Sequence, residues 1–208
     1  MTVEYSIESG KHQLQTPFSF YYDKKQYRKT DTTEFANKLK KLATFSTIED
    51  FWRIYLFLKR PSAIESNVNI YLFREGPGIV PMWEAFPHGG CWLLKVKKKG
   101  LVEGSSILGN LWHDLVLAFI GEAFEEPTVV GLSLAIRTRE DIICLWNEDN
   151  RCQEITLMIG AKLKEVLNLE PDTVIEYKAH KDSLHDLSTF RNTQTYVFAA
   201  KDKESNQS

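Results

Sequence analysis

A tryptophan and a glutamate, Trp83 and Glu84, are neighbours in a loop that glycines and prolines interrupt on both sides. Tyr71 and Phe73 precede the loop in an alternating run, and a second such run begins at Cys91, so two strands are predicted to flank it. Loops lie on the surface and lack the contacts that would bury an indole. An aromatic face beside a carboxylate suits a flat, electron-poor ring with paired N–H donors, such as guanine.

Two arginines form a second candidate site. Arg137 and Arg139 are two residues apart at the end of a predicted strand over 128–138, so they are expected to share one face. The return strand ends at Trp146, and hairpin pairing could place both guanidinium groups beside an exposed indole. Guanidinium forks suit phosphate oxygens. The alternative is that both arginines are simply the outward face of a strand.

Motifs of enzymatic chemistry are missing from the sequence. It contains no Walker loop, no Gly-x-Gly-x-x-Gly, no Gly-x-Ser-x-Gly and no His-Glu-x-x-His. His180 and His185 do not have the spacing of helical metal ligands, and His180 is expected to be a surface or hydrogen-bonded loop residue. We therefore expect no catalytic residue, no metal site and no cofactor. A nucleotide hydrolase would need a metal-binding carboxylate cluster, which the sequence does not reveal.

Length and composition predict one globular domain. The chain has 208 residues and a formal charge of −2, which argues against a long nucleic-acid track because such a track needs a broad basic surface. Its three cysteines form no Cys-x-x-Cys pair, which indicates reduced intracellular thiols. We expect a monomer with no membrane segment, located in the cytoplasm, with a nuclear location left open. The predicted boundaries are a flexible tail over 1–11, the domain over 12–200 and a disordered tail over 201–208.

One helix is apolar on nearly every side. It is predicted to begin with Ser46 as the cap and Glu49 completing a capping box, and to end at Pro61. Its core stripe is predicted to comprise Ile48, Phe51, Ile54, Tyr55 and Leu58, with Glu49, Trp52, Arg53 and Leu56 on the other side. Such a helix is either buried all round or binds a partner on its outer face.

The remaining elements predict an α+β fold. A second helix is expected from Ser105 or Ser106 to Gly121, with Trp112 off its main stripe, and a third from Asn150 to Asn168. About eight strands with hairpin-like connections predict one antiparallel sheet with three helices on a single face. The opposite face would carry the candidate site.

Five short motifs occur in an order that resembles the mRNA cap-binding translation initiation factor 4E family. They are Thr47-Ile48-Glu49-Asp50-Phe51-Trp52, Gly78-Ile79-Val80-Pro81-Met82-Trp83-Glu84, Gly89-Gly90-Cys91-Trp92, Leu111-Trp112 with Ile120-Gly121-Glu122, and Ile143-Cys144-Leu145-Trp146-Asn147. The resemblance runs from about His12 to Ser183. It implies a curved antiparallel sheet with three helices on its convex face and the cap site on its concave side.

The resemblance also implies roles for individual residues. The implied cap-binding residues are the stacking aromatics Phe35 and Trp83, the guanine-edge carboxylate Glu84, the indole Trp146 near the methyl group, and the phosphate contacts Arg137 and Arg139. The surface for a helical partner with a Tyr-x-x-x-x-Leu-apolar motif falls at Ile48, Glu49, Trp52 and Leu117, with Trp112 nearby. The implied ligand is the 7-methylguanosine triphosphate end of capped mRNA, held without reaction.

Departures from the family pattern indicate its second class, the 4E homologous proteins that often repress translation. Phe18 and Phe35 occupy positions that are tryptophan in initiation-type members, which implies weaker cap binding. Cys91 and Ile142 stand where basic residues are common, and Gly76-Pro77 resembles an insertion. The alternatives are an active initiation factor that recruits a scaffold to mRNA and, more remotely, a nucleotide or cap hydrolase.

Overall fold

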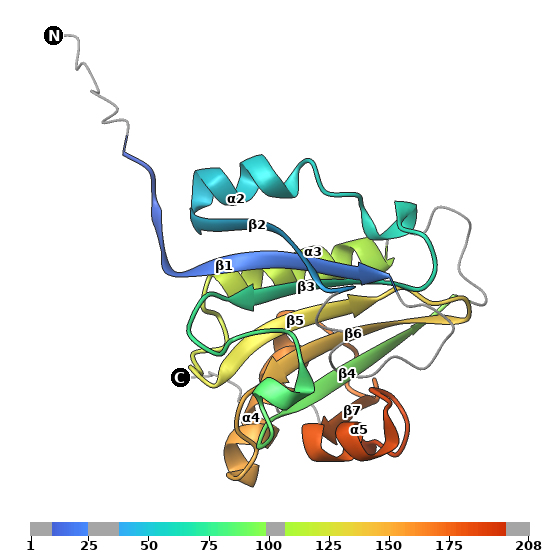
Figure 1. Cartoon of the computed structure of the whole chain (residues 1–208). Helices are drawn as coiled ribbons and strands as arrows, with labels where there is room; N and C mark the ends of the chain where they lie inside the picture. The colour runs from blue at the N-terminus through green and yellow to red at the C-terminus, as the bar shows by residue number, and fades with distance from the viewer. Residues whose placement is uncertain (1–9, 25–37, 99–106, 199–208) are drawn as a thin grey trace, which may run out of the picture.

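Eight antiparallel strands form one curved sheet, in the order β2-β1-β3-β5-β6-β4-β7-β8 (Figure 1). The computed structural model describes residues 10–24, 38–98 and 107–198. The strands are β1 (Gln13–Lys24), β2 (Lys40–Thr47), β3 (Val68–Arg74), β4 (Gly90–Lys97), β5 (Val129–Ala135), β6 (Glu140–Asn147), β7 (Ile175–Ala179) and β8 (Gln194–Tyr196). The predicted α+β class and strand number are confirmed.

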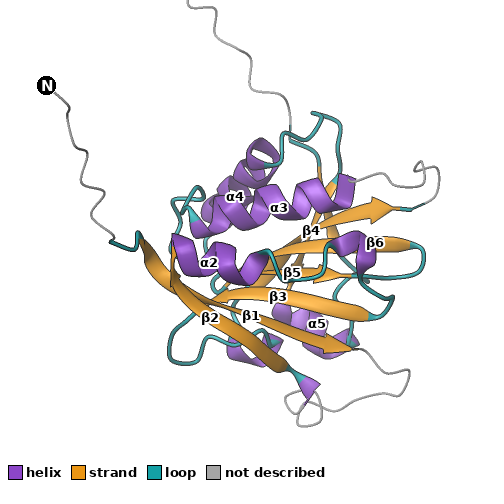
Figure 2. Ribbon diagram, turned by 90° about the horizontal axis from the view of Figure 1, so that it is seen from above, coloured by secondary structure: helices purple, strands orange, loops and turns teal. Residues whose placement is uncertain are grey.

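Three helices cover the convex face of this sheet (Figure 2). They are α2 (Ile48–Tyr55), α3 (Ile107–Ile120) and α4 (Gln153–Val166). A fourth helix, α5 (His180–Asp186), lies where the sequence predicted only a polar loop, so the expected helix number was too low. Two short 3-10 helices are η1 (Pro61–Ala63) and η2 (Trp83–Ala85). None of the helices in the described ranges is long and apolar enough to cross a membrane.

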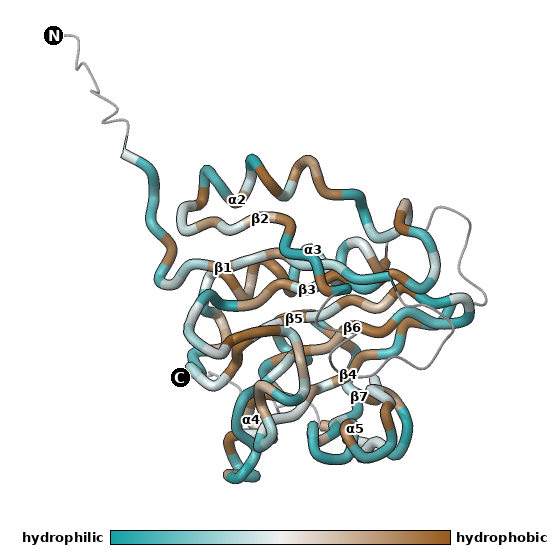
Figure 3. Tube along the Cα trace, in the orientation of Figure 1, coloured by the Kyte–Doolittle hydropathy of each residue, from teal (hydrophilic) through white to brown (hydrophobic). Residues whose placement is uncertain are grey.

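Strand alternation divides the apolar side chains between the two faces of the sheet. On β6, Ile143 and Leu145 point to the helices, whereas Ile142, Cys144 and Trp146 point to the concave face. The concave-face cluster comprises Tyr21, Tyr71, Phe73, Phe86, Cys91, Leu93, Val130, Ile142, Cys144 and Trp146. Figure 3 shows β5 and β6 largely hydrophobic and the hairpin that joins them hydrophilic.

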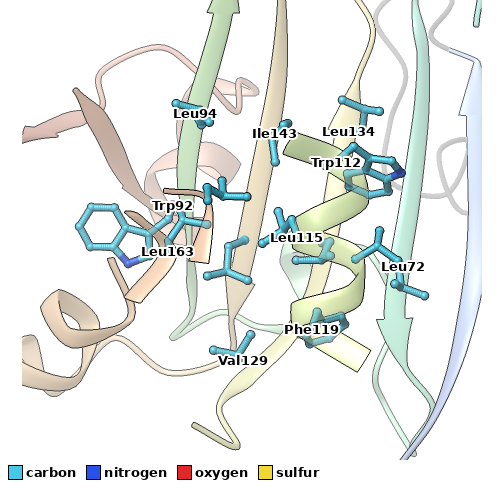
Figure 4. Close-up of a cluster of buried hydrophobic side chains, with 14 of the residues drawn as sticks. Leu72, Trp92, Leu94, Trp112, Leu115, Phe119, Val129, Leu134, Ile143 and Leu163 are labelled. Atoms are coloured by element: carbon cyan, nitrogen blue, oxygen red, sulfur yellow. The ribbon is translucent and has the colours of Figure 1, made fainter. Parts of the chain in front are cut away.

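The helix-side cluster contains Trp112, which the sequence placed beside a partner surface. Its side chain is only 4% exposed and lies with Leu115, Phe119 and Leu72 between α3 and the sheet (Figure 4). The prediction that Trp112 lies off the buried face of its helix was wrong, because it assumed that only one apolar stripe of the helix is buried. In a helix that lies across a curved sheet, the buried face is wider than one stripe.

The start of α2 also differs from the prediction. Thr47, and not Ser46, is the cap residue, and its hydroxyl oxygen accepts a hydrogen bond from the backbone nitrogen of Asp50 at 3.1 Å. The regular helix then ends at Tyr55. Because Thr47 is the cap, Ile48 is the first residue of the helix. Its side chain is exposed, whereas the predicted core stripe included it.

Replacing the cap residue tests this assignment. Thr47→Ala should lower the free energy of unfolding by about 1 kcal/mol, because the first turn loses its side-chain acceptor. Ser46→Ala is the matched control, since Ser46 is exposed and makes no cap bond. Urea unfolding curves of both variants provide the measurement. A larger loss for Ser46→Ala than for Thr47→Ala would place the cap at Ser46 instead.

Candidate functional site

The loop between β3 and β4, residues 75–89, is here called the Trp83 loop. Its η2 turn holds Trp83 half-buried against the concave-face cluster and leaves Glu84 exposed. Within the parts of the chain that the structure describes, neither the indole N–H nor the Glu84 carboxylate has a hydrogen-bond or ion-pair partner. An aromatic face and a carboxylate therefore stand next to each other on the loop, as the sequence predicted.

A buried histidine anchors the base of this loop. The backbone nitrogen of His180 donates to the carbonyl oxygen of Gly89 at 2.9 Å, and Asn150 Nδ2 donates to the same oxygen at 3.1 Å. His180 Nδ1 lies 2.9 Å from the carbonyl oxygen of Phe86. A carbonyl can only accept, so Nδ1 carries the proton. Gly89 also lets the loop pass close to the end of β6, because a Cβ there would lie 2.3 Å from the carbonyl oxygen of Asn147.

The second ring nitrogen of His180 faces a thiol. Its Nε2 lies 3.1 Å from Cys91 Sγ, and because Nδ1 holds the proton, the thiol donates to Nε2. Burial lowers the pKa of His180 to about 4 and raises the pKa of Cys91 well above its usual value. Both groups are therefore neutral near pH 7. Of the predicted surface or hydrogen-bonded loop residue, the hydrogen bonding is confirmed and the surface position was wrong, because α5 begins at His180 and the side chain is fully buried.

Trp146 forms part of the floor beneath the Trp83 loop. Its indole is 4% exposed, and its Nε1 donates to Ser133 Oγ at 2.9 Å. The ring centroid lies 4.7 Å from that of His180 and 5.3 Å, edge to face, from that of Phe73. The expectation of an exposed indole was wrong, because His180 and Phe73 cover the Trp146 side chain. Strand alternation gives the face on which Trp146 lies but not what packs on top of it.

Arg137 and Arg139 occupy the hairpin after β5 and do not share a strand face. Arg137 is half-buried and donates from Nη2 to Asn69 Oδ1 at 2.6 Å and from Nη1 to the carbonyl oxygen of Ile136 at 2.9 Å. Its backbone nitrogen donates to Asp141 Oδ1 at 2.9 Å, just beyond the end of β5 at Ala135. Arg139 is exposed, with no side-chain partner in the described ranges. The two guanidinium groups are therefore in different environments.

Other cations near this face are paired with carboxylates. Lys95 Nζ lies 2.7 Å from Glu176, and the buried Lys178 Nζ lies 2.6 Å from Asp186. The two positions noted for lacking a basic residue, Cys91 and Ile142, are buried in the concave-face cluster. Lys95 and Lys178 are therefore already paired, whereas Arg139 has no side-chain partner in the described ranges.

The outer side of α2 presents a separate apolar surface. Trp52 is 36% exposed, and its ring lies 6.1 Å from that of His113 on α3. Glu49 accepts from the backbone nitrogen of His12 at 3.0 Å and lies 2.7 Å from its Nδ1, so the chain entering β1 is fixed against α2. Leu117 is partly buried against the core. Trp112 is not part of this surface because it is buried.

Sequence reasoning missed Phe57, just past the end of α2. Leu56 is 73% exposed, on the outer side where the sequence placed it, and Phe57, which the sequence assigned to neither side of the helix, is 88% exposed. The run of apolar residues was visible in the sequence, but the early end of the helix was not. Phe35, the other predicted stacking aromatic, lies outside the described residues.

The buried imidazole predicts a dependence of stability on pH. The unfolded chain protonates His180 near pH 6.5, whereas the folded protein does so only near pH 4. The free energy of unfolding should therefore fall as the pH drops from about 6.5 to about 4, by roughly 3 kcal/mol at 1.36 kcal/mol per pKa unit. His180→Asn should flatten this slope in urea unfolding, and the exposed His185→Asn should keep it. A steep slope that survives His180→Asn would contradict the assignment.

This chain is similar to known proteins both in sequence and in structure. A family model described as eukaryotic initiation factor 4E matches residues 13–195. Eukaryotic translation initiation factor 4E-4 of Caenorhabditis elegans is 34% identical over 190 residues, which cover 90% of this chain and 85% of that protein. Eukaryotic translation initiation factor NCBP of Triticum aestivum is 33% identical over 190 residues, covering 90% and 78%.

Solved structures agree with the sequence comparison. Ascaris suum eIF4E-3 with m7G cap has a TM-score of 0.76 and 30% identity, covering 92% of this chain and 100% of that one. Caenorhabditis elegans eIF4E-3 with the 4E-binding protein Mextli and a cap analog has a TM-score of 0.74 and 31% identity, covering 85% and 96%. The family match spans most of the chain, and the relatives found by sequence and by structure are translation initiation factors of the same family. The chain therefore belongs to the eukaryotic initiation factor 4E family.

Proposed function

We propose that this protein binds the 7-methylguanosine 5′ cap of mRNA and thereby acts in translation. The observation that carries the proposal is the pair Trp83 and Glu84, whose side chains have no polar partner in the described structure while the base of their loop is fixed by His180. Methylation at N7 makes guanine cationic, so an aromatic face favours the methylated base. The Glu84 carboxylate would accept two N–H bonds from the guanine edge.

Relatives support this proposal. The solved structures of eIF4E-3 from Ascaris suum contain m7G cap or m2,2,7G cap, and that from Caenorhabditis elegans contains a cap analog. In the present chain, Arg139 would meet the phosphates as an exposed cation, and Arg137 would meet them from a fixed position in the same hairpin. We propose that the ligand is held without chemical change and that the protein acts in the cytoplasm. Release of product from capped RNA would contradict this.

The second class within the family is the finer proposal. It rests on Phe18 and Phe35, which replace tryptophans of initiation-type members. Phe18 is fully buried against Phe45 and Phe119, with ring centroids 5.9 and 5.2 Å apart, so it acts in the core. Weaker cap binding would therefore come from Phe35, whose smaller ring stacks less on a base. An initiation factor that recruits a scaffold remains the alternative.

A protein partner is proposed for the outer face of α2. The exposed Trp52 and Ile48 suit the apolar side of a helix with a Tyr-x-x-x-x-Leu-apolar motif. In the solved structures of Caenorhabditis elegans eIF4E-3, the bound protein is the 4E-binding protein Mextli. α2 covers the convex face, whereas the Trp83 loop lies over the concave-face cluster, so the protein could bind both ligands at once.

The Glu84 carboxylate provides the test of cap binding. Glu84→Gln should cost roughly 1.5–3 kcal/mol of binding free energy, because one guanine N–H would meet an amide N–H instead of an acceptor. Glu148→Gln, at an exposed residue with no side-chain partner in the described structure, is the control and should bind as the wild type does. Titrations of tryptophan fluorescence with 7-methylguanosine triphosphate and with GTP provide the measurement. Equal wild-type affinity for both nucleotides would remove the cap assignment.

Trp52 provides the test of the partner surface. Trp52→Ala should weaken binding of a synthetic helical peptide carrying the motif by roughly 2 kcal/mol or more, because interface tryptophans contribute strongly. Met158→Ala, at a half-exposed apolar residue on α4, should leave peptide binding unchanged. Calorimetry measures peptide affinity, and cap affinity is followed in parallel. Joint loss of cap affinity and melting temperature in Trp52→Ala would show instead that Trp52 supports the core.

A further inference from the structure

We propose that Asn69 is a positioning residue that holds the Arg137 guanidinium ready for the phosphates of the ligand. This inference rests on the proposed cap-binding function and names a residue outside the ligand contacts themselves. Asn69 lies on β3 and shares a strand face with Tyr71 and Phe73, both members of the concave-face cluster. Its side chain therefore stands on the same side of the sheet as the Trp83 loop.

The amide of Asn69 bridges an acid and a base. Asn69 Nδ2 donates to Asp23 Oδ1 at 2.8 Å, and Arg137 Nη2 donates to Asn69 Oδ1 at 2.6 Å. This orientation of the amide is the only one that fits, because a guanidinium can only donate and an ionised carboxylate can only accept. Strand register brings the three together, since Asn69 pairs with Asp23 on β1 and with Ala135 at the end of β5.

Asp23 fixes the amide in this orientation. Its side chain is almost fully buried and also accepts a hydrogen bond from the Tyr71 hydroxyl at 2.7 Å. Burial, and then the nearby Asp23, raise the pKa of Tyr71 well above its usual value, so the hydroxyl stays protonated and donates. A buried carboxylate requires such donors, and rotation of Asn69 would remove one of them. Asp23 therefore fixes the Asn69 amide, and the oxygen of that amide in turn fixes the Arg137 guanidinium.

Arg137 keeps free donors in this arrangement. A guanidinium has five N–H donors, and three of them bond to Asn69 and to the carbonyl oxygens of Ile136 and Val68. One hydrogen on Nε and one on Nη2 remain without a partner in the described structure. The backbone of Arg137 is fixed by Asp141. Because its rotamer is already set, Arg137 would lose little conformational entropy on binding an anion.

The hydrogen bonds that link Asp23, Asn69 and Arg137 are called the polar relay. A purely structural role for this polar relay makes a different prediction. The same bonds tie β1, β3 and the β5–β6 hairpin together, and weakening the fold would lower the affinity for every ligand alike. A positioning role affects only ligands that carry phosphates. Comparison of 7-methylguanosine triphosphate with 7-methylguanosine, which lacks phosphates, separates the two roles.

The experiment compares Asn69→Ala with Tyr71→Phe by titration of tryptophan fluorescence. Tyr71→Phe is the matched control, because it removes the hydrogen bond from Tyr71 to Asp23 but keeps the hydrogen bond between Arg137 and Asn69. Asn69→Ala should weaken binding of the triphosphate about fivefold, as expected for one hydrogen bond, and leave the nucleoside unchanged. Tyr71→Phe should leave the triphosphate-to-nucleoside ratio of affinities unchanged.

A double-mutant cycle with Arg137→Ala completes the test. If Asn69 acts through Arg137, then Asn69→Ala should cause no further loss of triphosphate affinity once Arg137 is alanine. Additive losses, equal losses for both ligands, or unchanged triphosphate affinity in Asn69→Ala would overturn the proposal. Failure of the wild type to prefer 7-methylguanosine triphosphate over GTP would instead overturn the cap-binding function, so the two failures are distinguishable.

Discussion

The hydrogen bond from His180 Nδ1 to the carbonyl oxygen of Phe86 joins α5 to the base of the Trp83 loop. The imidazole is buried and neutral, so this bond is shielded from water and persists across the physiological pH range. It is supported on the other side by the Cys91 thiol and by the ring of Trp146. Because the base of the loop is held in this way, the η2 turn presents Trp83 and Glu84 with no hydrogen bond from either side chain to the described structure.

The alternation of side chains across one sheet separates the two proposed binding surfaces. The helix-side cluster packs α3 and α4 onto the convex face, while the concave face keeps an aromatic floor and a polar relay at its edge. α2 contributes Phe51 to the core and leaves Trp52 outside. A helical partner and a nucleotide would therefore contact residues on opposite sides of the sheet, so any coupling between them would have to pass through the packed strands.

The fold was largely predictable because strand alternation and helix periodicity are local properties. Trp83 and Glu84 were found from a local signal too, a bulky residue and a carboxylate in a glycine- and proline-rich loop. The burial of His180 and Trp146 was not predictable, since it depends on how α5 closes over the sheet. The contrast between Arg137 and Arg139 depends on Asn69, which is far away in the sequence and reaches Arg137 only through strand register. The role of Phe35 stays a prediction from the sequence.

A crystal structure of the protein with 7-methylguanosine triphosphate, compared with the ligand-free protein, would test the central claim most directly. The account predicts that the base stacks on Trp83, that its N1 and N2 hydrogens point at Glu84, and that the bond between His180 and Phe86 is unchanged by binding. A nucleotide bound away from Trp83, or a loop that binds only after the bond between His180 and Phe86 has broken, would contradict it.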